Sequence, residues 1–460
     1  MKPSSPDESG SRRGTRSARL LLILAAALFH VSVTATVLII GRSALAPGQF
    51  DQKGLGTFAS DGFMYQDEVV ELCGILKAQG VVAWATWPTQ LHVRLYSLPV
   101  IALNGGTHFD ILTIEPLNLV YYLAILVLVF KLGEAVFNYR TGLMAAVAVA
   151  IWPSFLLHTT QLLRDPLLIA AFLILVLSLT LCLKRDYRWD RGVFIGVGGT
   201  AALVVIRIVR LPMWTMLSVV IMLAVLLLIV RLARQRHFSF GNVVLGIMML
   251  AALLITPRFQ DAFHNQQVVR RQRSILPEEV QELPVEEQIA ARRQGFALQL
   301  DTSGEPFPSE AGSDIDRGIQ FNSTADIFRH VPRAIVVGFF SPFSNMWLGA
   351  GKQVGGSGRR LAGFETVLSY VIECLALFGL WRARRDLSVW FVFLVITLGV
   401  IALGLVVANI GALYRLRYPF WSLLIVLGAG GADYLIRRRG MTASAGRDLA
   451  SKKSAETLHS

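Results

Sequence analysis

Four acidic side chains gather in the stretch SDGFMYQDEVVELCG, residues 60–74, of a chain that otherwise carries little charge. A carboxylate can accept a proton from a hydroxyl group, and this stretch offers Asp61, Asp67, Glu68 and Glu71 for that chemistry. The spacing predicts a helix on which Asp61 shares one face with Tyr65 and Glu68, while Asp67 and Glu71 share another. A structural interpretation stays open, in which Asp61 caps the helix and Asp67 and Glu71 face water.

A further acid, Asp165, lies between Arg164 and Pro166 at the start of a later apolar run. An acid next to a guanidinium group can belong to a site that binds phosphate and transfers protons. Proline also suits the first turn of a helix, so Asp165 can equally be a helix cap paired with Arg164. The sequence leaves both interpretations open.

Four more arginines flank apolar runs. Arg207 and Arg210 end the run GTAALVVIRIVRLP, and Arg415 and Arg417 lie in YRLRYP. A guanidinium group binds phosphate through paired donors, which makes all four candidates for a lipid-phosphate site. The alternative is that these long side chains only reach the membrane interface and anchor the chain there.

The composition indicates which elements position these residues. Of 460 residues, 54% are hydrophobic and 16% are charged, and the mean hydropathy is +0.54. Apolar runs of about 20 residues, the length that crosses a bilayer as a helix, recur along the chain. The net charge of +13 is divided among short clusters between these runs, as in membrane proteins, which argues against a nucleic-acid partner. Three widely separated cysteines form neither a disulfide framework nor a metal-binding motif.

The sequence therefore predicts an all-α polytopic membrane protein of about ten transmembrane helices. Basic clusters follow every second run, so both termini are predicted to be cytoplasmic and the candidate site residues to share the outer face. A multi-pass protein of the bacterial inner membrane fits this pattern. The expected spans lie at about 20–40, 114–132, 142–160, 166–183, 192–211, 212–230, 242–256, 361–380, 387–409 and 419–436.

Five parts follow from these spans. A basic cytoplasmic tail, 1–19, precedes a membrane core, 20–257, whose outer loop 41–112 carries the acidic stretch and interfacial helices. An extracytoplasmic polar loop, 258–332, separates this core from the C-terminal membrane helices, 333–436. A second cytoplasmic tail, 437–460, follows. Within the spans, His30 is expected to be a packing histidine, and Glu373 either bonds a neighbouring helix or belongs to a site.

Several motifs, in order, resemble the GT-C fold membrane glycosyltransferases, which include protein mannosyltransferase and aminoarabinose transferase relatives. The pattern Asp61-x3-Tyr65-x6-Leu72 is similar to the first outer loop of that family. The segment LGEAVFNYRTGLMAAVAVAIWPSFLLHTTQLLRDPLLIAAFLILVLSL is similar to its second to fourth spans, GTAALVVIRIVRLP to its fifth, and YRLRYP to the turn before its last span. The resemblance covers about 60–260 and 410–430. Where relatives often have Ser-Glu before the fourth span, this chain has Arg164-Asp165.

The resemblance implies a transferase that passes a sugar from a polyprenyl-phosphate donor to a lipid, glycan or protein acceptor at the outer membrane face, for a cell-envelope polysaccharide or a related product. It implies that Asp61 and Asp165 are catalytic, and that Tyr65, Glu68, Arg164, Arg207, Arg210, Arg415 and Arg417 bind substrate. It also implies that Asp61 is the general base or helps to hold a divalent cation such as Mg²⁺ or Mn²⁺. Relatives with two adjacent acids in the first loop leave the pair Asp67-Glu68 as the alternative to Asp61. No other cofactor is expected, and the metal ligands stay unknown.

Other functions remain as alternatives. A polymerase or ligase of lipid-linked oligosaccharides would use the same phosphate chemistry. A transporter usually shows two repeated halves with broken helices, and no such repeat is visible. A non-catalytic membrane scaffold would only present the 258–332 loop. The sequence contains no glycine-rich phosphate loop, HExxH motif or nucleophile elbow, which disfavours ATP, zinc and serine hydrolases.

Overall fold

The structure is a computed structural model of the 460-residue chain. It describes residues 7–43, 45–46, 48–235, 239–264, 284–300, 306–308, 314–316, 318–319, 321–349 and 355–457. Parts of the predicted polar loop 258–332, including residues 265–283, 301–305 and 309–313, therefore lie outside the described residues.

Helices make up nearly all of the described structure, with one small hairpin. The α-helices are α1 Asp7–Arg42, α2 Asp61–Thr86, α3 Leu91–Asn104, α4 Ile111–Val136, α5 Tyr139–Ala150, α6 Pro153–Thr159, α7 Asp165–Lys184, α8 Trp189–Val209, α9 Trp214–Gln235, α10 Phe240–His264, α11 Val285–Ala297, α12 Thr324–Phe340, α13 Gly355–Arg382, α14 Leu387–Val406, α15 Ile410–Leu416 and α16 Tyr418–Thr457. Short 3-10 turns occur at η1 Thr57–Ala59, η2 Leu211–Met213 and η4 Ser344–Met346. Strands β1 Leu298–Leu300 and β2 Pro306–Pro308 pair antiparallel.

The described residues include ten helices that are long and apolar enough to cross a membrane. These comprise α1, α2, α4, α7, α8, α9, α10, α13, α14 and α16, of which α1 and α16 qualify over 20–42 and 418–439. The prediction of an all-α, multi-pass membrane protein with about ten spans is confirmed. Nine of the ten predicted spans coincide with one of these helices.

The predicted span at 142–160 is broken in the structure. Helices α5 and α6 meet at a bend of 69°, at Trp152 and Pro153. Proline has no backbone N–H to donate and forces the residue before it out of the helical region, and Trp152 is accordingly extended, with φ −72° and ψ 115°. The bend turns α6 toward the loops at one end of the bundle.

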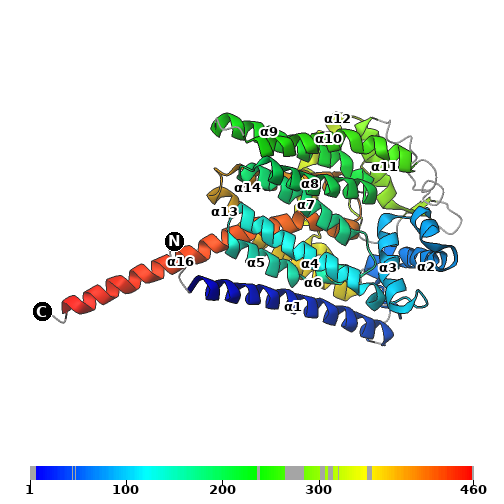
Figure 1. The fold of residues 1–460 in the computed structure, drawn as a ribbon, viewed down its shortest axis with the longest axis horizontal. Coiled ribbons are helices and arrows are strands. Elements are labelled where there is room, and N and C mark those ends of the chain that lie inside the picture. The colour runs from blue at the N-terminus through cyan, green and yellow to red at the C-terminus, as the bar shows by residue number, and fades with distance from the viewer. Residues whose placement is uncertain are drawn as a thin grey trace, which may run out of the picture.

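The predicted outer loop contains a helix that is itself long enough to span. Helix α2 is long and apolar enough to cross a membrane, but Gly80, with φ 85° and ψ −179°, interrupts it about three-quarters of the way along. Only glycine adopts that conformation without strain. Figure 1 shows α2 and α3 together at the right-hand end of the molecule. Their place supports the prediction of interfacial helices in the 41–112 loop.

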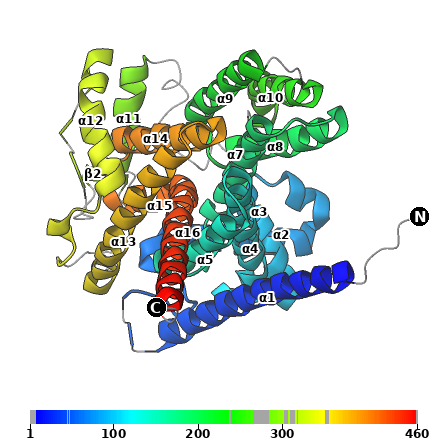
Figure 2. The ribbon, with the colours of Figure 1, turned by 90° about the vertical axis from the view of Figure 1, so that its left-hand side faces the viewer.

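The core of the bundle lies around α7 and α16. Within their spans, 78% and 72% of the residues are buried, against 22% for α1 at the edge. Figure 2 shows the two helices near the middle of the bundle, viewed along its long axis. Helix α16 lies against α13 backbone to backbone, because a Cβ on Gly379 would lie 2.6 Å from the Leu427 carbonyl oxygen. Small residues permit such close approach between membrane helices.

The basic clusters lie at the end of the bundle opposite α2 and α3. There Lys184, in the last turn of α7, forms an ion pair with Asp386 at the start of α14. Arg231 of α9 pairs with Asp186 at 2.8 Å. The two ends of the bundle thus differ in character: one carries paired basic residues, and the other carries the acidic stretch and the broken helix α6.

Candidate functional site

Two acids from distant parts of the chain bind one arginine at the α2–α3 end of the bundle. Arg415 Nη2 lies 2.7 Å from Asp61 Oδ2, and Arg415 Nε lies 3.1 Å from Asp165 Oδ2. Asp61 is the first residue of α2, Asp165 is the first residue of α7, and Arg415 is in the last turn of α15. The sequence singled out all three residues, and the structure brings them together.

Asp165 is the buried centre of this group. Its other carboxylate oxygen, Oδ1, lies 3.3 Å from Arg210 Nη1, so each of its oxygens faces a guanidinium group. Its side chain is only 6% exposed, whereas that of Asp61 is 33% exposed. Asp61 is therefore the carboxylate that a substrate can reach, and Asp165 is the one that holds two arginines in place.

The charges of the arginines reflect these surroundings. Burial favours the neutral form of Arg415, but Asp165 and Asp61 outweigh it and raise the pKa of Arg415 above its usual value. Burial, followed by repulsion from Arg164, lowers the pKa of Arg210 to about 10, despite the attraction of Asp165. Both groups stay charged at neutral pH. Three guanidinium groups against two carboxylates leave one excess positive charge, which suits an anionic ligand.

Arg164 contributes the third guanidinium group. Its Nε is buried and has no hydrogen-bond partner among the described residues, although it lies near enough to influence Tyr65, His92 and Asp165. A buried donor without a partner is costly in a folded protein, so a ligand or a water molecule is needed to satisfy it. Tyr65 lies beside this group with its ring edge-on to His92, at 4.5 Å between centroids.

The other predicted site residues lie apart from the two acids. Glu68 accepts a hydrogen bond from the Thr89 hydroxyl at 2.9 Å, and Asp67 is exposed. The guanidinium of Arg207 lies 4.5 Å from the ring centroid of Trp214. Arg417 donates to the carbonyl oxygen of Ser341 at 2.6 Å, and its described contacts include neither Asp61 nor Asp165.

Sequence reasoning missed a buried carboxylate that supports the site. Glu365 of α13 is fully buried and accepts hydrogen bonds from the Ser154 backbone N–H at 2.7 Å, from the Ser154 hydroxyl at 2.5 Å and from the Tyr414 hydroxyl. Ser154 belongs to the bent helix α6, and Tyr414 precedes Arg415. An acid inside a predicted span was the available signal, since such groups are rare unless they are paired.

His158 was also missed, and it lies at the edge of the site. Its Nδ1 donates to the Ser154 carbonyl oxygen at 2.7 Å, because a carbonyl can only accept. Its ring packs edge-on against Phe58 and Tyr418, with centroids at 5.1 Å and 5.4 Å. The bend at Trp152 and Pro153 puts His158 here, and the sequence alone did not reveal that bend.

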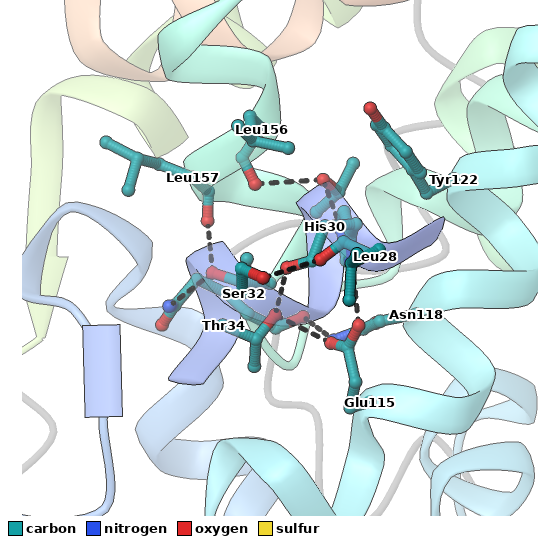
Figure 3. Close-up of polar contacts among 12 residues, drawn as sticks. Leu28, His30, Ser32, Thr34, Glu115, Asn118, Tyr122, Leu156 and Leu157 are labelled. Carbon is teal, nitrogen blue, oxygen red and sulfur yellow. Dashed lines mark hydrogen bonds and ion pairs between the residues drawn. The ribbon is translucent and has the colours of Figure 1, made fainter. Parts of the chain in front are cut away.

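A buried polar network holds the chain just before Asp165. Figure 3 shows His30, Thr34 and Glu115 facing one another between α1 and α4. His30 Nδ1 lies 2.7 Å from Glu115 Oε1, His30 Nε2 lies 3.0 Å from Thr159 Oγ1, and Thr34 donates to Glu115 Oε2 at 2.7 Å. His30 is buried as expected, and its hydrogen bonds also tie α1 to the end of α6.

Further bonds fix the turn between α6 and α7. The Gln161 side chain accepts from the Gly56 N–H at 2.8 Å and donates to the Gly54 carbonyl oxygen at 3.3 Å. The Tyr96 hydroxyl lies 3.2 Å from the Leu163 carbonyl oxygen. Asp165 thus starts its helix from a turn that contacts α1, α3 and the loop before α2. Such supporting bonds fix the geometry of a site more closely than its own residues can.

The acids of this group are paired with arginines. Among the described residues, no three or more His, Cys, Asp or Glu side chains come close enough to hold a metal ion. The two acids that a cation would bridge are both paired with Arg415. A hard divalent cation prefers several oxygen ligands, and here two carboxylates share their space with three guanidinium groups.

Comparisons with known proteins give a distant structural similarity. No protein-family model matches the sequence, and no curated protein matches it. Among solved structures, the fold is similar to that of the archaeal oligosaccharyltransferase AglB from Archaeoglobus fulgidus, solved in complex with an inhibitory peptide and a dolichol-phosphate, with a TM-score of 0.41 and 10% sequence identity. The similarity covers 92% of this chain and 52% of that protein, so this chain spans about half the length of its match. A similarity this distant does not establish a shared activity.

Proposed function

We propose that this protein is a GT-C-like membrane glycosyltransferase that takes a sugar from a polyprenyl-phosphate donor. The observation that carries the proposal is the meeting of Asp61, Asp165, Arg164, Arg210 and Arg415 at one end of an apolar bundle. Charged groups at membrane depth are expensive and mark functional sites, and this group combines an accessible carboxylate with a net positive charge. That pairing suits transfer from a lipid-linked phosphate to a hydroxyl acceptor.

The residues divide the reaction between them. Asp61 accepts the proton of the acceptor hydroxyl, whose oxygen forms a new bond to the anomeric carbon of the sugar. The bond from that carbon to the phosphate oxygen breaks, and the phosphate keeps the electron pair and gains a negative charge. Arg164, Arg210 and Arg415 stabilise that charge, which develops as the bond breaks. A single displacement of this kind inverts the configuration of the sugar.

The site lies at the predicted outer face. The basic clusters at 184–191, 231–236, 382–385 and 437–439 are then cytoplasmic, as the positive-inside rule requires. A lipid-phosphate donor fits this side, because the lipid brings the activated sugar within the membrane to the site.

Substitution of the accessible acid tests the proposal. Asp61→Asn should lower transfer by at least about 100-fold, because an amide cannot take up a proton at neutral pH. Asp67→Asn removes an exposed acid two turns further along the same helix and should leave transfer near the wild-type rate. Purified protein, a set of synthetic polyprenyl-phosphate sugars and mass spectrometry of the products supply the measurement. Full activity in Asp61→Asn, with equal expression, would rule out the assigned base.

A further inference from the structure

We propose that Arg415 replaces a divalent cation in this site, so that the protein works with a fixed organic cation and needs no metal ion. The claim that transfer needs no metal ion rests on the proposed function. The claim that Arg415 occupies the place of a cation between the two acids does not. A cation that links two catalytic carboxylates would have to lie between Asp61 and Asp165. The guanidinium group of Arg415 already lies there, with one nitrogen on each acid.

The geometry favours the guanidinium over an ion. Arg415 donates a hydrogen bond to Asp61 through Nη2 at 2.7 Å and makes an ion-pair contact with Asp165 through Nε at 3.1 Å, so one guanidinium group lies against both acids. A magnesium ion requires oxygen ligands at about 2.0–2.1 Å in an octahedral arrangement. To provide such oxygen ligands, both carboxylates would have to leave Arg415 and turn toward each other. Asp165 is held on its other side by Arg210, 3.3 Å from Oδ1, which opposes that turn.

The surrounding charge also opposes a metal ion. Arg415, Arg210 and Arg164 all lie near enough to influence Asp165, and repulsion from Arg164 contributes to the lowered pKa of Arg210. A doubly charged cation would add to this crowding of positive charge. The two carboxylates are already balanced by the arginines that surround them, so they offer little further attraction to a cation.

The position of Arg415 is built into the fold. Tyr414, one residue earlier, donates to the buried Glu365, which also accepts two hydrogen bonds from Ser154. On the other side of Arg415, Arg417 donates to the Ser341 carbonyl oxygen. The short helix α15 is thus fixed at both flanks of Arg415. A cation that is fixed by the protein needs no reorganisation when the phosphate charge develops.

Binding of Mn²⁺ to the purified full-length protein tests the structural part without any substrate. Electron paramagnetic resonance of the free ion measures how much is bound by the wild type and by Asp61→Asn. The proposal predicts that the two proteins bind Mn²⁺ equally at millimolar concentration. Binding by the wild type that is lost in Asp61→Asn would overturn it.

Transfer assays test the catalytic part. The proposal predicts that EDTA leaves wild-type transfer unchanged, and that Arg415→Gly lowers it by about 100-fold. Added guanidinium ion should restore part of that loss, whereas Mg²⁺ and Mn²⁺ should not. Loss of wild-type activity in EDTA, with recovery on adding Mg²⁺, would contradict the proposal. If no donor supports transfer, the proposed function fails, and the Mn²⁺ comparison still decides whether the two acids form a metal site.

Discussion

At the scale of single residues, the two arginines of YRLRYP have different roles. Arg415 binds Asp61 and Asp165, whereas Arg417 bonds to the carbonyl oxygen of Ser341 and lies 4.5 Å from the ring centroid of Tyr414. Residues two apart in a helical turn point to nearly opposite sides. The side chains of Arg415 and Arg417 therefore reach different partners although they are close in sequence.

This difference predicts opposite results for two conservative substitutions. Arg415→Lys should lower transfer by about 100-fold, because lysine keeps the charge but has a single nitrogen and cannot place separate nitrogens against the two acids. Arg417→Lys should keep most of the activity, since an ammonium group can still donate to one carbonyl oxygen. Steady-state rates of the two purified variants check this. Equal losses in both would show that the turn acts as a unit.

The sequence predicted which types of residue form the site, but it did not separate the members that meet from those that do not. Asp61, Asp165, Arg164, Arg210 and Arg415 were all candidates and now lie together. Glu68, Arg207 and Arg417 were candidates on equal terms, because helical spacing and membrane depth do not show which way a side chain turns. That depends on packing between elements far apart in the chain.

At the scale of elements, α3 supports the site through His92. This residue is 1% exposed, and burial together with the nearby Arg164 lowers its pKa from 6.5 to about 3. Its neutral ring packs against Tyr65, two residues before Asp67 in the acidic stretch. Helix α3 thus presents an uncharged face to the crowded arginines.

The lowered pKa of His92 predicts a pH dependence of stability. The unfolded chain takes up a proton near pH 6.5 and the folded chain does not, so the contribution is complete above pH 6.5 and is lost as the pH falls toward 3. At pH 5 the loss is ~2 kcal/mol. His92→Gln removes the titrating group, so its Tm should fall less than that of the wild type between pH 7 and pH 5. Parallel curves in thermal unfolding of the two proteins would contradict the assignment.

Helix α16 depends on glycine where it crosses α13. A Cβ on Gly379 would lie 2.6 Å from the Leu427 carbonyl oxygen and 3.0 Å from the Gly431 nitrogen, so Gly379→Val should push the helices apart and lower the Tm. Gly198→Val is the matched control, because nothing lies within 4 Å of a Cβ there. Thermal unfolding of both variants in detergent measures the difference. Equal Tm values would show that the crossing tolerates a side chain.

The sequence predicted helix boundaries well where a proline did not interrupt the apolar run, and less well at 142–160, where Pro153 does. The runs that became α7, α8 and α14 matched their expected spans closely. The single span expected at 142–160 became α5 and α6, although Pro153 was visible in the sequence. A proline bends or ends a helix according to what packs around it, and here the bonds of Ser154 to Glu365 favour the bend.

At the scale of the whole molecule, the two ends of the bundle predict a membrane orientation. A reporter fused after residue 440, beyond the basic cluster 437–439, should behave as cytoplasmic. A reporter inserted at Gly105, in the turn that follows α3 at the site end, should behave as external. An external C-terminus would place the site on the cytoplasmic side and remove the basis for an outer-face reaction.

The general architecture followed from composition, because a membrane restricts a chain of this hydropathy to helices of spanning length. The site did not follow in the same way. It requires the starts of α2 and α7 to meet the ends of α8 and α15. That meeting depends on helix packing, on the bend before α6 and on the buried bonds of His30 and Glu365. These contacts join residues that lie up to hundreds of positions apart.

The central claim is that this protein consumes a polyprenyl-phosphate sugar. Mass spectrometry of lipid extracts and surface glycans, from cells that lack the protein, tests it most directly. We predict that one polyprenyl-phosphate sugar accumulates while one sugar disappears from the surface glycans, and that wild-type protein reverses both changes but Asp61→Asn does not. Unchanged lipid-linked sugars and unchanged glycans in those cells would contradict the claim.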